Sequence, residues 1–248
     1  MLPYQLFGNP DMRGPFLPIG MALCLATTLG AVEQDLPVIE LFTSEGCSSC
    51  PPADALLHRL GGDGRIICLA FQVDYWNYLG WHDPWSSALA SARQQDYARQ
   101  LGGGVYTPCA VVNGRAAVLG SDQDAIAAAL AAPRIPMLPL TLIATWGPHA
   151  VDLTAQLVKA PAQTQILFAL VENGLHSMVA AGENRGSRLS HDHVVRAFTC
   201  VGLDAGSARA HLTIPQDLMV GNSQLIAFAS TAADGIIGAT TLDPPAPK

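Results

Sequence analysis

The chain has 248 residues, of which half are hydrophobic and 13% are charged. This composition supplies ample apolar side chain for a packed core and excludes an intrinsically disordered protein. The formal net charge is −7, and the 13 lysines and arginines form no cluster, which argues against nucleic acid as a partner because phosphate binding needs a basic face.

The N-terminal residues have the character of a targeting segment. Arg13 precedes an apolar run over residues 15–32 that ends in small residues, and the polar residues Glu33–Asp35 follow. This pattern predicts a signal peptide over residues 1–31, and therefore export. The run is also near the lower length limit for an uncleaved membrane anchor. After cleavage we expect no integral membrane segment.

Residues 37–133 predict the element order β-α-β-α-β-β-α. The first strand, Val38–Thr43, and the first helix, Pro52–Leu60, are followed by an unbroken apolar strand over residues 65–73 and by a helix over residues 83–101. Asn113–Gly114 between two apolar runs indicates a hairpin with a type I′ turn, and a last helix ends near Leu130. With a cysteine pair after the first strand, this order predicts an α/β thioredoxin-like domain with its first two strands parallel.

Beyond a proline-spaced linker at residues 134–139 the pattern changes. Short β-rich runs separated by turn residues follow, at residues 140–145, 151–158, 165–171, 194–200, 210–214 and 224–230. No long helical period occurs among them. We therefore expect a smaller, mostly β, sandwich-like domain over residues 138–243.

The segment FTSEGCSSCPP, residues 42–52, carries the candidate chemistry. Cysteines at i and i+3 at the start of a helix lie close enough for a disulfide. Unpaired backbone N–H groups and the helix dipole favour a thiolate at Cys47, so we expect Cys47 to be the nucleophile and Cys50 the resolving thiol. A structural disulfide or half of a metal site are the alternatives for this pair.

Thr107–Pro108 stands just before the predicted hairpin. In a thioredoxin layout a proline at this point is cis, and it brings backbone against the disulfide, where a substrate strand can pair. We therefore predict that Thr107 and Pro108 contact substrate. Cys109 is more simply a small buried strand residue than a third redox thiol.

The segment DYWNYLGWHDPW, residues 74–85, is dense in aromatic residues. If the preceding strand is parallel to the first, Tyr75, Trp76 and Trp81 emerge at the same sheet edge as the cysteines and could bind apolar side chains of a protein or peptide. An aromatic cluster under the loop is the alternative. Glu40 and His82 are candidates for proton transfer, with Glu40 as an acceptor for Cys50.

The segment GENRGSRLSHDHVVR, residues 182–196, is polar and contains His191 and His193. Two histidines at i and i+2 of a strand face the same way and could bind a metal. No third ligand is evident, so a polar hairpin tip beside the first domain is the preferred interpretation.

Four segments together resemble a family of exported bacterial proteins that are thioredoxin-like and carry a domain of unknown function: ELFTSEGCSSCPPADALL, FQVDYWNYLGWHDP, VYTPCAVVNGR and GENRGSRLSHDHVVR. The resemblance runs from about residue 37 to the last strands. It implies a thioredoxin-like first domain, a periplasmic or secreted location, and active-site positions for Cys47, Cys50 and Pro108. Cys109 departs from the family, in which glutamine usually follows the Thr-Pro pair.

The leading hypothesis is an exported thiol–disulfide oxidoreductase that acts on protein or peptide thiols through Cys47 and Cys50 and needs no cofactor. The direction of the reaction is left open, because a change of about 30 mV in potential is a tenfold change in equilibrium. A copper- or zinc-binding protein is the first alternative, with His82, His191 or Cys109 as further ligands. The second is a non-enzymatic binding module with a static disulfide.

Overall fold

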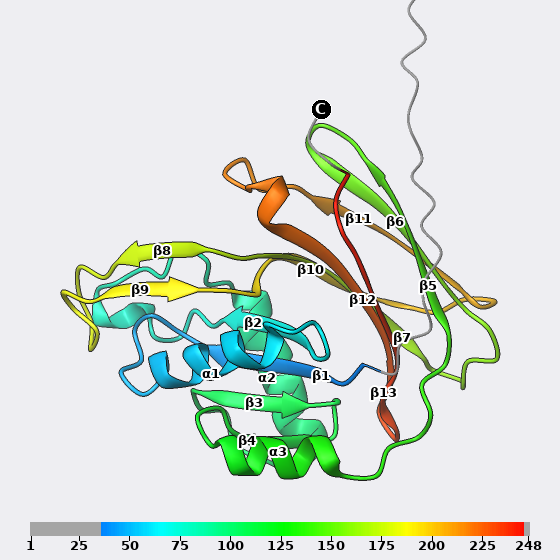
Figure 1. Cartoon of the computed structure of the whole chain (residues 1–248), viewed down its shortest axis with the longest axis horizontal. Coiled ribbons are helices and arrows are strands. Elements are labelled where there is room, and N and C mark those ends of the chain that lie inside the picture. The colour runs from blue at the N-terminus through cyan, green and yellow to red at the C-terminus, as the bar shows by residue number, and fades with distance from the viewer. Residues whose placement is uncertain (1–35, 246–248) are drawn as a thin grey trace, which may run out of the picture.

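The computed structural model describes residues 36–245, and these residues are mostly β (Figure 1). An eight-stranded mixed sheet has the order β13-β12-β7-β10-β2-β1-β3-β4. The elements are β1 Val38–Thr43, α1 Pro51–Gly61, β2 Ile67–Gln72, α2 Ala88–Leu101, β3 Cys109–Val112, β4 Ala116–Leu119, α3 Gln123–Ala131, β5 Leu140–Trp146, β6 Ala150–Leu157, β7 Gln165–Glu172, β8 Leu175–Met178, β9 Arg188–His191, β10 Val194–Gly202, β11 Ser207–Thr213, β12 Ser223–Thr231 and β13 Gly235–Leu242.

Strand β1 is buried on both faces, which explains its unbroken apolar sequence. Ile39 and Leu41 belong to the core cluster that includes α1, whereas Val38 and Phe42 belong to the cluster that includes Tyr97 of α2. Successive side chains of a strand point to opposite faces, so the two helices cover opposite faces of β1. This alternation decides which polar side chains of β1 can reach the cysteines.

The expected turn at Asn113–Gly114 is confirmed. Both residues have positive φ, 51° and 66°, as a type I′ turn requires. The side-chain oxygen of Asn113 also accepts a hydrogen bond from the backbone N–H of Val38 at 2.9 Å, so the turn is tied to the start of β1.

The predicted fold class, an α/β thioredoxin-like domain followed by a smaller sandwich-like domain, is wrong. One edge of β2 pairs with β1, and the other pairs in parallel with β10, where Val194 lies opposite Ala70. The backbone N–H of Ala70 donates to the carbonyl of His193 at 2.7 Å. Strand β10 pairs in turn with β7 and β7 with β12, so strands from both halves of the chain form one mostly antiparallel sheet.

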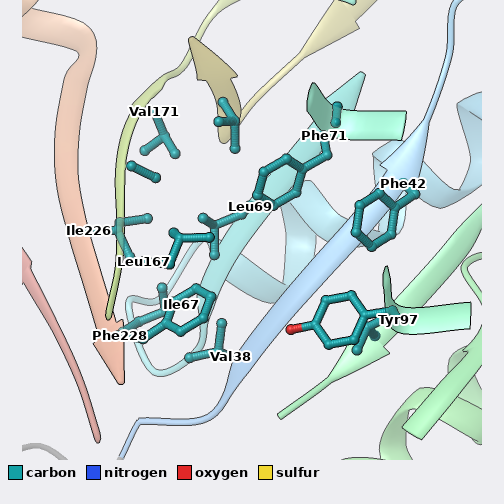
Figure 2. Packing of buried hydrophobic residues seen from close by; sticks show 14 of the residues in the cluster. Val38, Phe42, Ile67, Leu69, Phe71, Tyr97, Leu167, Val171, Ile226 and Phe228 are labelled. Carbon is teal, nitrogen blue, oxygen red and sulfur yellow. The ribbon is translucent and has the colours of Figure 1, made fainter. Parts of the chain in front are cut away.

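A shared hydrophobic core joins the two halves (Figure 2). Leu69 and Phe71 of β2 belong to the same cluster as Leu167 of β7 and Phe228 of β12. The rings of Phe71 and Phe198 meet edge to face with centroids 5.1 Å apart. Because burying an apolar side chain contributes about 1.5–3 kcal/mol, this shared core stabilises the two halves together.

The remaining strands form two smaller sheets. Strands β11, β6 and β5 make a three-stranded sheet whose Leu142 and Leu153 share a second core cluster with Phe168 and Leu225 of the large sheet. Strands β8 and β9 pair only with each other, and α1 contacts β9. In Figure 1 this β8–β9 hairpin extends alongside α1, away from the three-stranded sheet.

No helix in residues 36–245 is long and apolar enough to cross a membrane. The predicted signal peptide, residues 1–31, lies outside the described residues. Export therefore stays a prediction. The predicted domain bounds, 37–133 and 138–243, also stay predictions.

Candidate functional site

The two cysteines lie in the connection between β1 and α1. Cys47 is in the turn that follows β1, where its N–H donates to the carbonyl of Ser44 at 3.2 Å. Cys50 precedes Pro51 and caps α1, since its carbonyl accepts the N–H groups of Ala53 and Asp54 at 2.8 and 3.1 Å. Both thiols are free, and both residues are buried, with 1% and 0% of their surface exposed.

The surroundings of the two thiols shift their pKa values in opposite directions. A hydrogen bond from Cys50 lowers the pKa of Cys47 to about 6, against the effect of burial and with help from Ser49, whose hydroxyl lies 3.2 Å from the sulfur. Burial, together with the charge on Cys47, raises the pKa of Cys50 well above its usual range. Since the thiolate is the nucleophile, Cys47 is suited to attack and Cys50 holds its proton.

The peptide bond between Thr107 and Pro108 is cis, as the sequence predicts, and it lies beside Cys47. The sulfur of Cys47 is 3.8 Å from the carbonyl oxygen of Thr107, and the indole N–H of Trp76 donates to the Thr107 hydroxyl at 2.8 Å. Burial raises the pKa of Tyr75 to about 12, and the two thiols add to this effect. The structure therefore brings Tyr75, Trp76 and Thr107 to the thiol pair.

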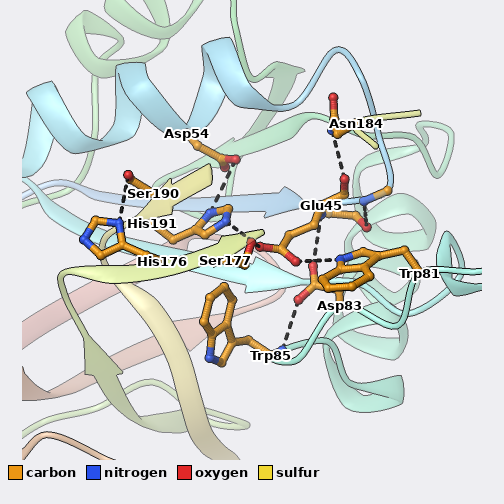
Figure 3. A network of polar contacts seen from close by, with 12 residues as sticks. Glu45, Asp54, Trp81, Asp83, Trp85, His176, Ser177, Asn184, Ser190 and His191 are labelled. Carbon is orange, nitrogen blue, oxygen red and sulfur yellow. Dashed lines mark hydrogen bonds and ion pairs between the residues drawn. The ribbon is translucent and has the colours of Figure 1, made fainter. Parts of the chain in front are cut away.

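Trp81 lies elsewhere, in a buried polar network around Glu45 (Figure 3). Its indole N–H donates to Glu45 Oε2 at 2.7 Å, and the hydroxyl of Ser177 donates to Glu45 Oε1. Nε2 of His191 lies 2.9 Å from the same Oε1. The carboxylate of Asp83 accepts the backbone N–H of Glu45 at 3.0 Å. Glu45 thus links the turn before Cys47 to the β8–β9 hairpin.

The titratable groups of this network are strongly perturbed. Burial raises the pKa of Asp54 to about 7 and that of Asp83 to about 6. For Glu45, burial is outweighed by hydrogen bonds from His191, Ser177 and Trp81, which lower its pKa. For His191, burial is outweighed by Glu45 and Asp54, which raise its pKa. Glu45 and His191 therefore form a buried ion pair, and Asp54 titrates near neutrality.

Asp54 was not identified from the sequence as a site residue. It lies on α1 four residues after Cys50, and Oδ2 is 3.8 Å from Nδ1 of His191. Residues at i and i+4 share a helix face, so an acidic residue at this spacing from Cys50 was the available signal. His191 itself reaches the site as part of a hairpin, although it contacts carboxylates instead of a metal.

Other predicted residues lie away from the thiols. Glu40 is fully buried on the α2 face of β1, where it is paired with Arg93 and accepts a hydrogen bond from Tyr97. Thr43 lies on the α1 face with Asp54, so Glu40 is on the wrong side of β1 to serve Cys50. His82 is exposed and contacts the carbonyl of Asp83.

Cys109 and His193 also stand apart from the thiol pair. Cys109 is buried in β3 within the core cluster that includes Tyr97, and burial raises its pKa. His193 follows β9 with a φ of 58° and packs against Gly61, so it does not share a strand face with His191. Residues 36–245 contain no group of three His, Cys, Asp or Glu side chains arranged to hold a metal ion.

The loop of the β8–β9 hairpin covers the cysteine turn. The carboxylate of Glu183 accepts the N–H and the hydroxyl of Ser48 at 2.9 and 2.7 Å. The Asn184 amide donates to the carbonyls of Glu45 and Cys47. The preferred interpretation of residues 182–196, a polar hairpin tip, agrees with these contacts, and the hairpin completes the site from the other half of the chain.

Comparison with known proteins identifies a family but no activity. A family profile described as "Protein of unknown function (DUF1223)" matches residues 38–230. An X-ray crystal structure of a protein from Agrobacterium tumefaciens is similar at 29% identity, with a TM-score of 0.63, over 88% of this chain and 98% of that chain. A β-glucosidase from Kluyveromyces marxianus aligns over 42% of this chain and 14% of that chain, at 11% identity, but its TM-score of 0.19 carries no argument. No curated protein matches.

Proposed function

We propose that this chain, which belongs to the DUF1223 family of proteins of unknown function, is a thiol–disulfide oxidoreductase that acts through Cys47 and Cys50. The observation that carries the proposal is the placement of two free thiols, Cys47 in the turn after β1 and Cys50 at the start of α1, beside the cis bond at Thr107–Pro108. The pKa of Cys47 is lowered to about 6 by a hydrogen bond from Cys50, whereas burial raises that of Cys50. Cys47 is therefore a nucleophile at neutral pH, and Cys50 keeps its proton until it attacks the mixed disulfide in the second step.

The substrate of this proposal is a protein or peptide thiol or disulfide. Tyr75, Trp76 and the backbone of Thr107 lie beside Cys47 and offer an apolar and hydrogen-bonding surface to an extended peptide. Cys47 is buried, so the proposal requires its cover to move before a substrate disulfide can reach the sulfur. We further propose an oxidising compartment outside the cytoplasm as the place of action, on the basis of the N-terminal sequence.

The test is the redox equilibrium of the pair in the mature protein. Thiols are trapped across a glutathione series and each cysteine is located by mass spectrometry. We expect a reversible transition confined to Cys47 and Cys50 that the Cys47→Ser variant abolishes. Cys200→Ser, which removes an exposed thiol outside the site, is the matched control and leaves the transition unchanged. A pair that stays reduced or stays oxidised throughout the series would refute the proposal.

A further inference from the structure

A group of buried polar atoms without hydrogen-bond partners lies behind the thiol pair. They are the hydroxyl of Thr43, Oδ1 of Asp54, the side-chain amide of Gln72 and Nδ1 of His191. Thr43 and Gln72 are paired in register on β1 and β2. These four residues bring atoms that can donate or accept a proton to one place on the α1 side of β1 and β2.

These atoms form a path that begins at Cys50. Asp54 lies one helical turn after Cys50 on α1. Thr43 is buried at the end of β1 and alternates with Ile39 and Leu41 onto the face of the sheet that α1 covers. On the far side, Oδ2 of Asp54 is 3.8 Å from His191 Nδ1. Nε2 of His191 is held by Glu45 at 2.9 Å. The order is therefore Cys50, Thr43, Asp54, His191 and Glu45.

We propose that Asp54 is the proton acceptor for Cys50. His191, which Glu45 holds in place, orients the Asp54 carboxylate and stabilises its negative charge. The inference rests on the proposed thiol–disulfide exchange. In the step concerned, Cys50 attacks the sulfur of Cys47 in a mixed disulfide with substrate. The bond between Cys47 and the substrate sulfur breaks and the Cys47–Cys50 bond forms. The electron pair of the broken bond leaves on the substrate thiolate, and the proton of Cys50 passes to Asp54, with the Thr43 hydroxyl between them.

The charges around Asp54 favour its ionisation at the step in which Cys50 attacks the mixed disulfide. His191 on β9 stabilises the carboxylate, whereas Asp83 and the Cys47 thiolate oppose it. When Cys47 enters a mixed disulfide its sulfur becomes neutral, and the repulsion of Asp54 by the thiolate is lost. Asp54 therefore ionises more readily at the stage of the reaction in which Cys50 must lose a proton.

A single-turnover reaction with 5,5′-dithiobis(2-nitrobenzoate) tests the step directly. Attack by Cys47 releases one coloured thiolate at a rate that depends on reagent concentration. Attack by Cys50 on the mixed disulfide releases a second coloured thiolate at a rate that does not depend on reagent concentration. This second rate measures resolution by Cys50. The exposed Cys200 is replaced by serine in every protein compared. Cys50→Ser gives the trace without resolution.

We expect Asp54→Asn to slow resolution about 100-fold at pH 7, with a smaller difference at higher pH, where solvent removes the proton. His191→Gln should slow resolution by a smaller factor than Asp54→Asn and should shift the pH dependence of the resolution rate. Thr43→Val, which keeps the shape of the side chain, should slow it several-fold and serves as an independent test of the path if Asp54→Asn does not fold. Asp63→Asn, an exposed carboxyl near the end of α1, is the control and leaves the rate unchanged.

The outcomes separate the two proposals. If the parent protein releases no second thiolate, the oxidoreductase proposal itself fails. If the parent resolves and Asp54→Asn or Thr43→Val resolves at the same rate at every pH, the exchange stands and the role of Asp54 is overturned.

Discussion

The side-chain amide of Asn184 donates a hydrogen bond to the carbonyl oxygen of Cys47 at 2.9 Å, across 137 residues of sequence. The same nitrogen donates to the carbonyl of Glu45, also at 2.9 Å. The turn that carries the candidate nucleophile is therefore held by a side chain from the β8–β9 hairpin.

Replacing Asn184 by alanine should loosen this turn. Two hydrogen bonds are lost and two carbonyl groups are left without this donor, so we expect the free energy of unfolding to fall by about 1–3 kcal/mol. The hairpin loop holds the backbone of Cys47 and Ser48, so a looser turn should expose the sulfur. Alkylation of Cys47 by iodoacetamide should therefore become faster at a pH where its thiol is fully ionised. Arg185→Ala, an exposed neighbour in the same loop, is the matched control. Equal alkylation rates in the two variants would show that the loop does not limit access to Cys47.

What the sequence could predict at this site was local. The cysteine pair, its place at a strand–helix junction and the proline at 108 follow from short segments whose meaning does not depend on the rest of the chain. The turn at Asn113–Gly114 is of this kind, whereas the cis bond at Thr107–Pro108 was predicted from the expected thioredoxin layout and not from the segment alone.

The pairing of β10 with β2 could not be predicted in the same way. Both strands have the buried, apolar pattern that fits many partners, and nothing in either segment specifies the other. The expected thioredoxin-like fold therefore failed at the β2 edge, where strands from the two halves of the chain pair. The same holds for His191, whose position against Glu45 and Asp54 depends on that long-range assembly.

The assignment of Glu40 as a proton acceptor failed because of the face that it occupies. Glu40 is paired with Arg93, and the Arg93 guanidinium lies 5.0 Å from the ring centroid of Tyr97. Glu40→Gln leaves a buried arginine without its counter-ion, so we expect a loss of about 3–5 kcal/mol in the free energy of unfolding. Measured under folding conditions, the pH dependence of resolution by Cys50 should be unchanged. A shift in the pH dependence of resolution by Cys50 would show that Glu40 does affect the proton transfer.

The shared core predicts that the first half of the chain is not an independent unit. A fragment of residues 36–134 would expose the β2 edge that β10 covers and the face of Phe71 that contacts Phe198. We expect this fragment to aggregate or to lack the cooperative thermal transition of the full chain, because an exposed apolar edge strand templates association. The comparison is between the fragment alone and the fragment mixed with residues 135–245. A soluble fragment with its own sharp transition would contradict the shared core and support two folding units.

The raised pKa of Asp54 predicts a specific dependence of stability on pH. Its pKa rises from 3.8 in the unfolded chain to about 7 in the folded protein, chiefly because the carboxyl is buried. The folded state therefore binds this proton more tightly than the unfolded state does. The stability that follows is fully present below about pH 4, and it is lost as the pH rises through 7.

Asp54→Asn removes this proton-binding group. The free energy of unfolding of the variant, minus that of the parent, should increase with pH by an amount on the order of 4 kcal/mol between pH 4 and pH 8. Urea unfolding at pH steps across this range measures the difference, and a constant offset from the new amide does not alter its slope. Asp63→Asn, at an exposed carboxyl, should run parallel to the parent. If Asp54→Asn also ran parallel, folding would not raise the pKa of Asp54, and its carboxylate would be a weaker base than the proposed transfer from Cys50 requires.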